Sequence, residues 1–163
     1  MLKTDFEKFT SPTLGRVSFE ELIEKTKHFI SEDDKSSYKV VVGTDSSSKE
    51  KIDGDFVSVI LVHRIGSGGI YFWNRSANGR FHHFKERIYQ EALFSLEIAE
   101  KLTKELKGNG LSLDNLEIHV DIGPKGETRE MISEIVGMIK GNGFNAKIKP
   151  ESYGASCVAD RHT

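Results

Sequence analysis

The sequence contains a single cysteine, Cys157. One thiol cannot form an internal disulfide bond, and it cannot supply the several thiolates of a structural zinc site within one chain. The composition therefore fits a reducing compartment. Because Cys157 lies next to Val158 and Ala159, we interpret it as a packing residue rather than as a nucleophile paired with the nearby His162.

Long apolar runs are absent as well. The longest, such as residues 59–62, fall far short of the roughly 20 residues that a membrane-spanning helix needs. Residues 1–10 include four charged side chains and lack the apolar segment of a secretory signal. We therefore expect a cytoplasmic protein with no membrane partner.

Neither sign of charge dominates the chain. Its 23 Lys and Arg residues face 25 Asp and Glu residues, a net charge of -2 at pH 7, so a nucleic-acid partner must bind a local patch. Residues 63–87 predict such a patch, since they combine five basic residues with one acid and five aromatic residues. Basic side chains can follow phosphates and exposed aromatic rings can stack on bases, although half of the aromatic residues of a strand must face the core. The basic and aromatic residues are Arg64, Arg75, Arg80, Lys85, Arg87, Tyr71, Phe72, Trp73, Phe81 and Phe84.

The remaining composition, 37% hydrophobic and 29% charged over 163 residues, is that of one globular domain. We expect residues 1–37 to form a polar arm and a helix that pack on a core domain of residues 38–163. The helix should begin at Ser18, because Ser18 and Glu21 have the spacing in which each side chain bonds the backbone N–H of the other residue.

The core domain shows a regular succession of strand and helix patterns. Residues 38–44 lack polar alternation and predict a central strand buried on both faces. Two antiparallel strands should follow, joined by a glycine-rich segment. This order predicts an α/β fold with a mixed five-stranded sheet flanked by helices and preceded by one extra helix. The other expected elements are strands at 56–63, 70–74, 116–120 and 144–149, helices at 82–107 and 128–140, and a short helical end within 152–163.

Three acids stand where chemistry is expected. Asp45 and Asp121 each follow a buried strand, where ligands bind in open α/β sheets. One such aspartate more often caps a turn, but two on neighbouring strands bring like charges together, which is unfavourable without a cation between them. Glu91 lies on the apolar face of the long helix, where a buried carboxylate is costly unless it is paired or bound to a metal. Two alternatives remain open: Glu91 lies at the boundary and reaches solvent, or Glu86, nearer the helix start, is the helix acid.

The order of elements over residues 38–162 resembles the ribonuclease H-like fold. Three segments, Gly-Thr-Asp-Ser-Ser at 43–47, Asp-Ile-Gly-Pro-Lys-Gly-Glu-Thr at 121–128 and the ending at 151–163, resemble the YkuK-like bacterial proteins of that superfamily. In the superfamily the first strand, the first long helix, the fourth strand and the last helix each supply an acid. Only a stub follows the last of these acids, so the final helix is shorter than in typical ribonucleases H. The matching residues are Asp45, Glu91, Asp121 and Asp160.

This resemblance implies a nuclease that uses Mg²⁺ or Mn²⁺. Carboxylate oxygens suit both ions, and two ions about 3.5–4 Å apart can activate a water and stabilise the leaving oxygen. We expect Asp45 and Asp121 to contact or bridge the ions and Glu91 and Asp160 to complete the coordination shells. The expected substrate is RNA, an RNA/DNA hybrid or structured DNA.

Two other function classes stay open. One is a non-catalytic module that binds nucleic acid or a nucleotide, and the other is a phosphotransfer enzyme related to sugar kinases, which normally needs two such domains. Residues 123–128 lack the spacing of a phosphate-binding loop. No nucleophile elbow surrounds Ser46, which disfavours a triad with His162 and Asp121. Candidates for handling protons or phosphate charge, with a plain surface role as the alternative, are His83, Lys85, Lys125 and His162.

Overall fold

The computed structural model describes residues 6–46, 54–79, 83–111, 113, 116–126, 129–159 and 162. In this part of the chain the strands form one seven-stranded sheet with the order β2-β1-β5-β4-β3-β6-β7. The strands are β1 (Lys8–Ser11), β2 (Gly15–Ser18), β3 (Tyr38–Ser46), β4 (Gly54–Arg64), β5 (Gly69–Gly79), β6 (Leu116–His119) and β7 (Asn145–Lys147). The helices are α1 (Phe19–Ser31), α2 (Phe84–Gly108) and α3 (Ile132–Gly141), with short turns η1 (Arg129–Met131) and η2 (Gly154–Ala159).

The α/β class and the mixed sheet predicted from the sequence are confirmed, but the predicted number of five strands is wrong. The five expected strands are β3 to β7, and two more come from the polar arm that precedes α1. β1 and β2 are only four residues each, too short for an alternating pattern to be recognised. They form a hairpin in which Gly15, at φ 74°, begins β2 directly after the turn, and the hairpin adds to the sheet where Thr10 pairs with Trp73.

The predicted start of α1 is confirmed in detail. The Ser18 hydroxyl accepts a hydrogen bond of 3.1 Å from the Glu21 N–H, and the Glu21 carboxylate accepts one of 3.4 Å from the Ser18 N–H. These bonds satisfy donors that a helix start otherwise leaves unpaired. The buried residues Phe19, Leu22 and Ile23 then fix α1 against the core.

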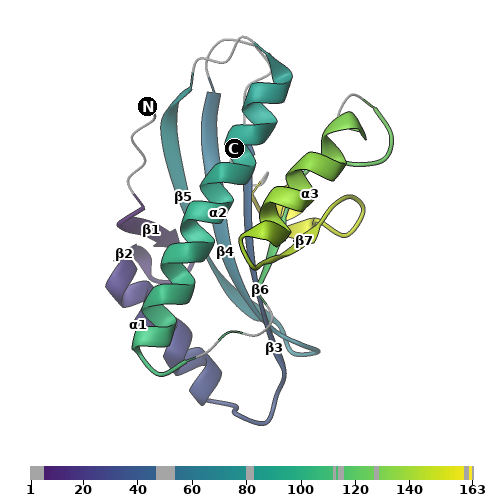
Figure 1. Ribbon diagram of the computed structural model, residues 1–163. Helices are drawn as coiled ribbons and strands as arrows, with labels where there is room; N and C mark the ends of the chain where they lie inside the picture. Colours follow the sequence, from purple (N-terminus) through teal and green to yellow (C-terminus); the bar gives the residue numbers. More distant parts are fainter. Residues whose placement is uncertain are drawn as a thin grey trace.

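The sheet has two differently covered faces. Figure 1 shows α1, α2 and α3 in front of the strands, and we call the covered side the helix face. Its side chains include Val40, Val42, Ile60 and Ile118, which belong to the main core. Alternate residues point to the opposite side, where a second apolar cluster gathers Val57, Val59, Tyr71 and Trp73 around Val158 and Ala159 of η2. We call this side the C-terminal face.

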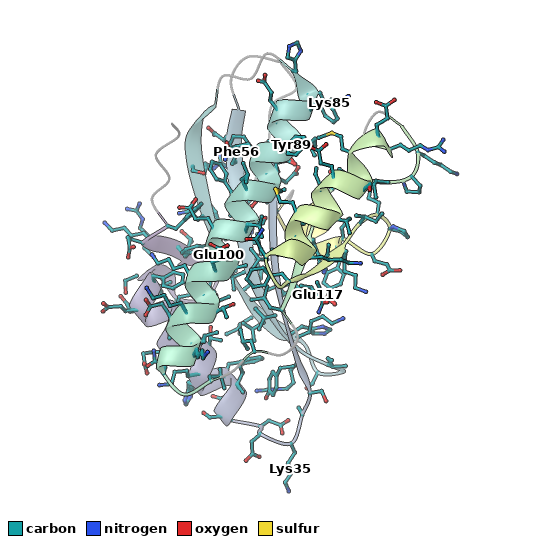
Figure 2. All side chains as sticks on the ribbon, in the orientation of Figure 1. Lys35, Phe56, Lys85, Tyr89, Glu100 and Glu117 are labelled. Atoms are coloured by element: carbon teal, nitrogen blue, oxygen red, sulfur yellow. The ribbon has the colours of Figure 1, made fainter. Side chains whose placement is uncertain are left out.

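Strand directions determine which ends of the elements meet. β3, β6 and β7 run parallel, while β4, β5, β1 and β2 continue from β3 in antiparallel order. Lys35 precedes β3 and lies at one end of the molecule, whereas Lys85, in the first turn of α2, lies at the other (Figure 2). The carboxyl end of β3 and the N-terminal end of α2 are therefore close together.

Candidate functional site

Asp45 and Asp121 stand at the carboxyl ends of two adjacent parallel strands. The register of β3 and β6 pairs Gly43 with His119, and each aspartate lies two residues beyond its member of that pair. Asp45 is buried, with 9% of its surface exposed, and Asp121 is half-buried. Adjacent parallel strands thus bring these two carboxylates to one edge of the sheet.

Glu91 is the acid of α2 that faces the sheet. Its side chain is 3% exposed, whereas Glu86 is exposed. Burial raises the pKa of Glu91, the hydrogen bond from Ser46 lowers it, and the charges of Asp45 and Asp121 raise it as well, which together give a pKa of about 8. Because both aspartates act on Glu91, the three carboxyl groups lie in one electrostatic neighbourhood.

Ser46 orients the Glu91 carboxyl group. Its hydroxyl donates a hydrogen bond of 2.6 Å to Glu91 Oε1. The second oxygen, Oε2, is buried and has no hydrogen-bond partner among the described residues. A buried carboxyl oxygen without a partner costs free energy, so Oε2 is an unsatisfied atom of the site.

Three buried hydroxyl groups fix α2 on the sheet one turn beyond Glu91. Thr44 Oγ1 lies 2.8 Å from the Ser58 hydroxyl and 2.8 Å from the Ser95 hydroxyl. These contacts link β3, β4 and α2 within the helix face. The sequence patterns did not single out these hydroxyl groups, because isolated Ser and Thr residues in apolar segments carry no distinctive spacing.

Lys149 forms an ion pair with Asp121 that the sequence did not predict. Its Nζ lies 3.1 Å from Asp121 Oδ1, and both side chains have some exposure to solvent. The chain after β7 comes this close because the residue opposite is Gly123, where a Cβ would lie 3.2 Å from Lys149 Cβ. One carboxylate of the site therefore already has a positive partner.

The C-terminal turn η2 is anchored to the sheet beside Asp121. The Gly154 N–H donates a hydrogen bond of 3.0 Å to His119 Nδ1, and the other ring nitrogen, Nε2, lies 3.1 Å from Glu117 Oε1. Since Nδ1 accepts, the ring carries its proton on Nε2, and burial lowers the pKa of His119. A Cβ on Gly154 would lie 2.6 Å from Val41 Cγ1. Only glycine allows this close approach of η2 to β3.

The fourth predicted acid, Asp160, lies outside the described residues. Among the residues that are described, no three His, Cys, Asp or Glu side chains are grouped so that they could hold a metal ion. Asp45, Glu91 and Asp121 are thus neighbours without forming a closed three-ligand cage. The remaining site predictions stay predictions.

The basic and aromatic patch predicted at residues 63–87 is divided by the fold. Phe72 is buried on the helix face and Phe84 is 37% exposed, while Arg80 and Phe81 lie outside the described residues. On the C-terminal face, the His162 ring stacks on Trp73 with centroids 4.5 Å apart and lies 3.1 Å from the Tyr71 hydroxyl. Lys85 faces Glu130 at 3.5 Å.

No helix in the described part of the chain is long and apolar enough to cross a membrane.

Sequence comparison agrees with the fold. A model of the family described as "Ribonuclease H-like" matches residues 21–163. The chain belongs to the ribonuclease H-like family. Within it, the chain is similar to "Uncharacterized protein YkuK" of Bacillus subtilis (strain 168), with 33% identity over 164 residues that cover 91% of this chain and 92% of the relative. This places the chain with the YkuK-like members of the ribonuclease H-like family. No solved structure matches it significantly.

Proposed function

We propose that this ribonuclease H-like protein is a nuclease that depends on Mg²⁺ or Mn²⁺ and hydrolyses phosphodiester bonds in RNA, an RNA/DNA hybrid or structured DNA. The observation that carries the proposal is the environment of Glu91. Its carboxyl group is buried, its Oε2 lacks a hydrogen-bond partner among the described residues, and two aspartates act on its charge.

The donor set fits a hard divalent cation. Asp45, Glu91 and Asp121 offer only carboxylate oxygens, which Mg²⁺ and Mn²⁺ prefer over nitrogen or sulfur ligands. A cation among them would offset the repulsion between the three carboxylates, which adds to the effect of burial on the pKa of Glu91, and would give Oε2 a partner. Asp160, which follows η2 in the chain, is the fourth acid of the proposed set. When bound, the ions activate a water molecule for attack on phosphorus and stabilise the oxygen that leaves.

The protein groups hold the site in place for this chemistry. Ser46 restrains one oxygen of Glu91, and the other has no hydrogen-bond partner among the described residues. The Thr44 hydroxyl contacts with Ser58 and Ser95 fix the distance between α2 and β3. Because these supports belong to regular elements, the site needs little reorganisation on binding.

A second candidate is a nucleic-acid-binding module without catalysis. It is favoured by the absence, among the described residues, of three acids already grouped around a metal position, and by the ion pair between Lys149 and Asp121. A lysine on a carboxylate can replace a cation there.

One experiment separates these two functions. End-labelled RNA, RNA/DNA hybrid and junction DNA are incubated with the protein in Mn²⁺, in Mg²⁺ and in EDTA, beside the variants Asp45→Asn and Glu86→Gln. We expect cleavage that requires the metal, disappears in Asp45→Asn and persists in Glu86→Gln, because Glu86 is exposed. Binding without cleavage of any substrate would favour the module, and cleavage that persists in Asp45→Asn would contradict the proposed site.

A further inference from the structure

A basic pocket lies on the C-terminal face, on strands that bear none of the three candidate acids. It has a volume of about 360 Å³ and is formed by the hairpin β1–β2 and the neighbouring strand β5. Its lining residues are Lys8, Phe9, Thr10, Arg16, Trp73, Asn74 and Arg75. Three of these side chains are cationic and none is acidic, in a protein whose net charge is -2.

Two of the three cations have no acidic partner among the residues that the structure describes. Lys8 and Arg16 are exposed, and no ion pair involves either side chain among the described residues. Arg75 is held in place, since it lies 3.2 Å from Asp55 Oδ2 and also donates to the carbonyl oxygen of His162. The pocket therefore combines one oriented guanidinium group with two cations that form no ion pair within the described part of the chain, and such a group attracts phosphate.

Strand register places this pocket in line with Asp45. Asp45 pairs with Val57, and Val57 pairs with Arg75, so these three side chains share the C-terminal face. Thr10 pairs with Trp73 in antiparallel order. Two residues back along β1 and two residues forward along β5, Lys8 therefore lies opposite Arg75. At about 4.8 Å per strand, Lys8 lies three strand spacings, roughly 14 Å, from Asp45 along the sheet. That span equals about four nucleotide steps of a duplex strand at ~3.4 Å each.

We propose that the pocket of Lys8, Arg16 and Arg75 binds the phosphate groups of a nucleic-acid strand that continues from Asp45 across the C-terminal face. This inference rests on the proposed nuclease function and names the surface that holds its substrate. Phosphate contacts of this kind position a strand without reading its sequence. The hairpin β1–β2 thereby adds a binding surface to the ribonuclease H-like core.

Trp73 provides a direct readout of the pocket. It is the only tryptophan of the chain, it lines the pocket, and one face of its ring is covered by His162. Any change in tryptophan emission on adding a ligand therefore arises from Trp73, and no other tryptophan contributes to the signal.

The test is a binding titration without turnover. A single-stranded RNA of about 12 nucleotides is titrated in EDTA into the Asp45→Asn protein, and the emission of Trp73 and the anisotropy of a label on the RNA are followed at several salt concentrations. The same titration is made with Lys8→Gln/Arg16→Gln added, and with the matched change Lys104→Gln/Lys107→Gln, which removes two exposed lysines from α2 on the opposite side of the sheet. Adenosine monophosphate replaces the RNA in a further arm.

We expect Lys8→Gln/Arg16→Gln to weaken RNA binding by ten-fold or more at low salt and to reduce the slope of log K against log salt by about 1.4, since each single-strand phosphate contact contributes ~0.7. The matched variant should lose far less affinity and keep the slope. Equal behaviour of the two double variants would overturn the inference, and so would adenosine monophosphate binding as tightly as the RNA. Melting temperatures close to that of the parent protein verify that both variants are folded.

The outcome is distinguishable from a failure of the nuclease proposal. If no substrate is cleaved but RNA binding depends on Lys8 and Arg16, the pocket stands and the nuclease function fails. If metal-dependent cleavage occurs and Lys8→Gln/Arg16→Gln leaves KM unchanged, the nuclease stands and the pocket fails.

Discussion

The Ser46 hydroxyl donates a 2.6 Å hydrogen bond to Oε1 of Glu91, joining the end of β3 to the second turn of α2. This bond is the main interaction that favours the ionised form of a carboxyl group whose burial and acidic neighbours favour the protonated form. Either a change of pH or a bound cation can therefore change the protonation state of Glu91.

The first prediction concerns the pH dependence of stability without metal. The pKa of Glu91 rises from 4.5 in the unfolded chain to about 8 in the folded protein. Its contribution to the free energy of unfolding is therefore fully present below about pH 4.5 and is lost as the pH rises through 8, by on the order of a few kcal/mol. In EDTA, Glu91→Gln should remove this loss, so that the variant melts higher than the parent protein at pH 9 and differs little at pH 4.5.

Glu86→Gln is the control for this measurement, because Glu86 lies on the same helix but is exposed. Melting curves at intervals of half a pH unit should show the parent slope in Glu86→Gln and a flatter profile in Glu91→Gln. Parallel profiles for Glu91→Gln and the parent protein would show that Glu91 does not titrate in this range.

The second prediction concerns cation binding. Mn²⁺ should raise the melting temperature of the parent protein at pH 8, because it binds the ionised acids of the folded state only. At a concentration 100 times the dissociation constant the gain is about 2.7 kcal/mol, which corresponds to roughly 5–10 °C for a domain of this size. Asp45→Asn and Asp121→Asn should lose most of this rise. A rise that survives in both variants would place the cation elsewhere.

The third prediction concerns the ion pair between Lys149 and Asp121. Lys149→Gln should bind Mn²⁺ several-fold more tightly, because it frees Asp121 Oδ1 from a positive neighbour at 3.1 Å. Stability without metal should change by less than about 1 kcal/mol, since the pair is partly exposed to solvent. Lys147→Gln is the matched control, because Lys147 pairs with Glu151 at 3.6 Å instead. A Mn²⁺ affinity that is equal in both variants would contradict the competition between lysine and cation.

The fourth prediction concerns the contact between η2 and β3. Gly154→Ala should destabilise the protein by about 1–3 kcal/mol, because its Cβ would lie 2.6 Å from Val41 Cγ1 and 3.1 Å from His119 Nδ1. Gly137→Ala, in the middle of α3 with no atom within 4 Å of the added Cβ, should instead stabilise it by ~0.5–1 kcal/mol. Chemical denaturation of both variants measures the difference, and equal effects would mean that η2 is free to shift.

Much of the fold could be predicted because it depends on local patterns. The spacing of Ser18 and Glu21 determined where α1 begins, and helical periodicity indicated that Glu91 rather than Glu86 faces the sheet. The hairpin β1–β2 escaped prediction because its apolar residues, Phe9 and Val17, are single positions in a polar segment. No periodicity could show that this segment pairs with β5.

The site could be predicted only in part, for a related reason. Asp45 and Asp121 could be proposed from the sequence, because ligands bind at the carboxyl ends of strands in open α/β sheets. The hydrogen bond from Ser46 to Glu91 and the ion pair between Lys149 and Asp121 could not, because they depend on tertiary distances between separate segments. The basic pocket also requires knowledge of register, since Lys8 and Arg75 become neighbours only when β1 joins the sheet.

The parallel pairing of β3 with β6 has a consequence for the order of folding. β3, β4 and β5 follow one another in the chain and can pair through local connections, whereas β4, β5 and α2 separate β6 from β3 along the chain. Because contacts between distant segments form late, we expect the two aspartates to meet late in folding. A cation held between them would therefore slow unfolding while leaving the refolding rate nearly unchanged, and would lengthen the lifetime of the folded structure.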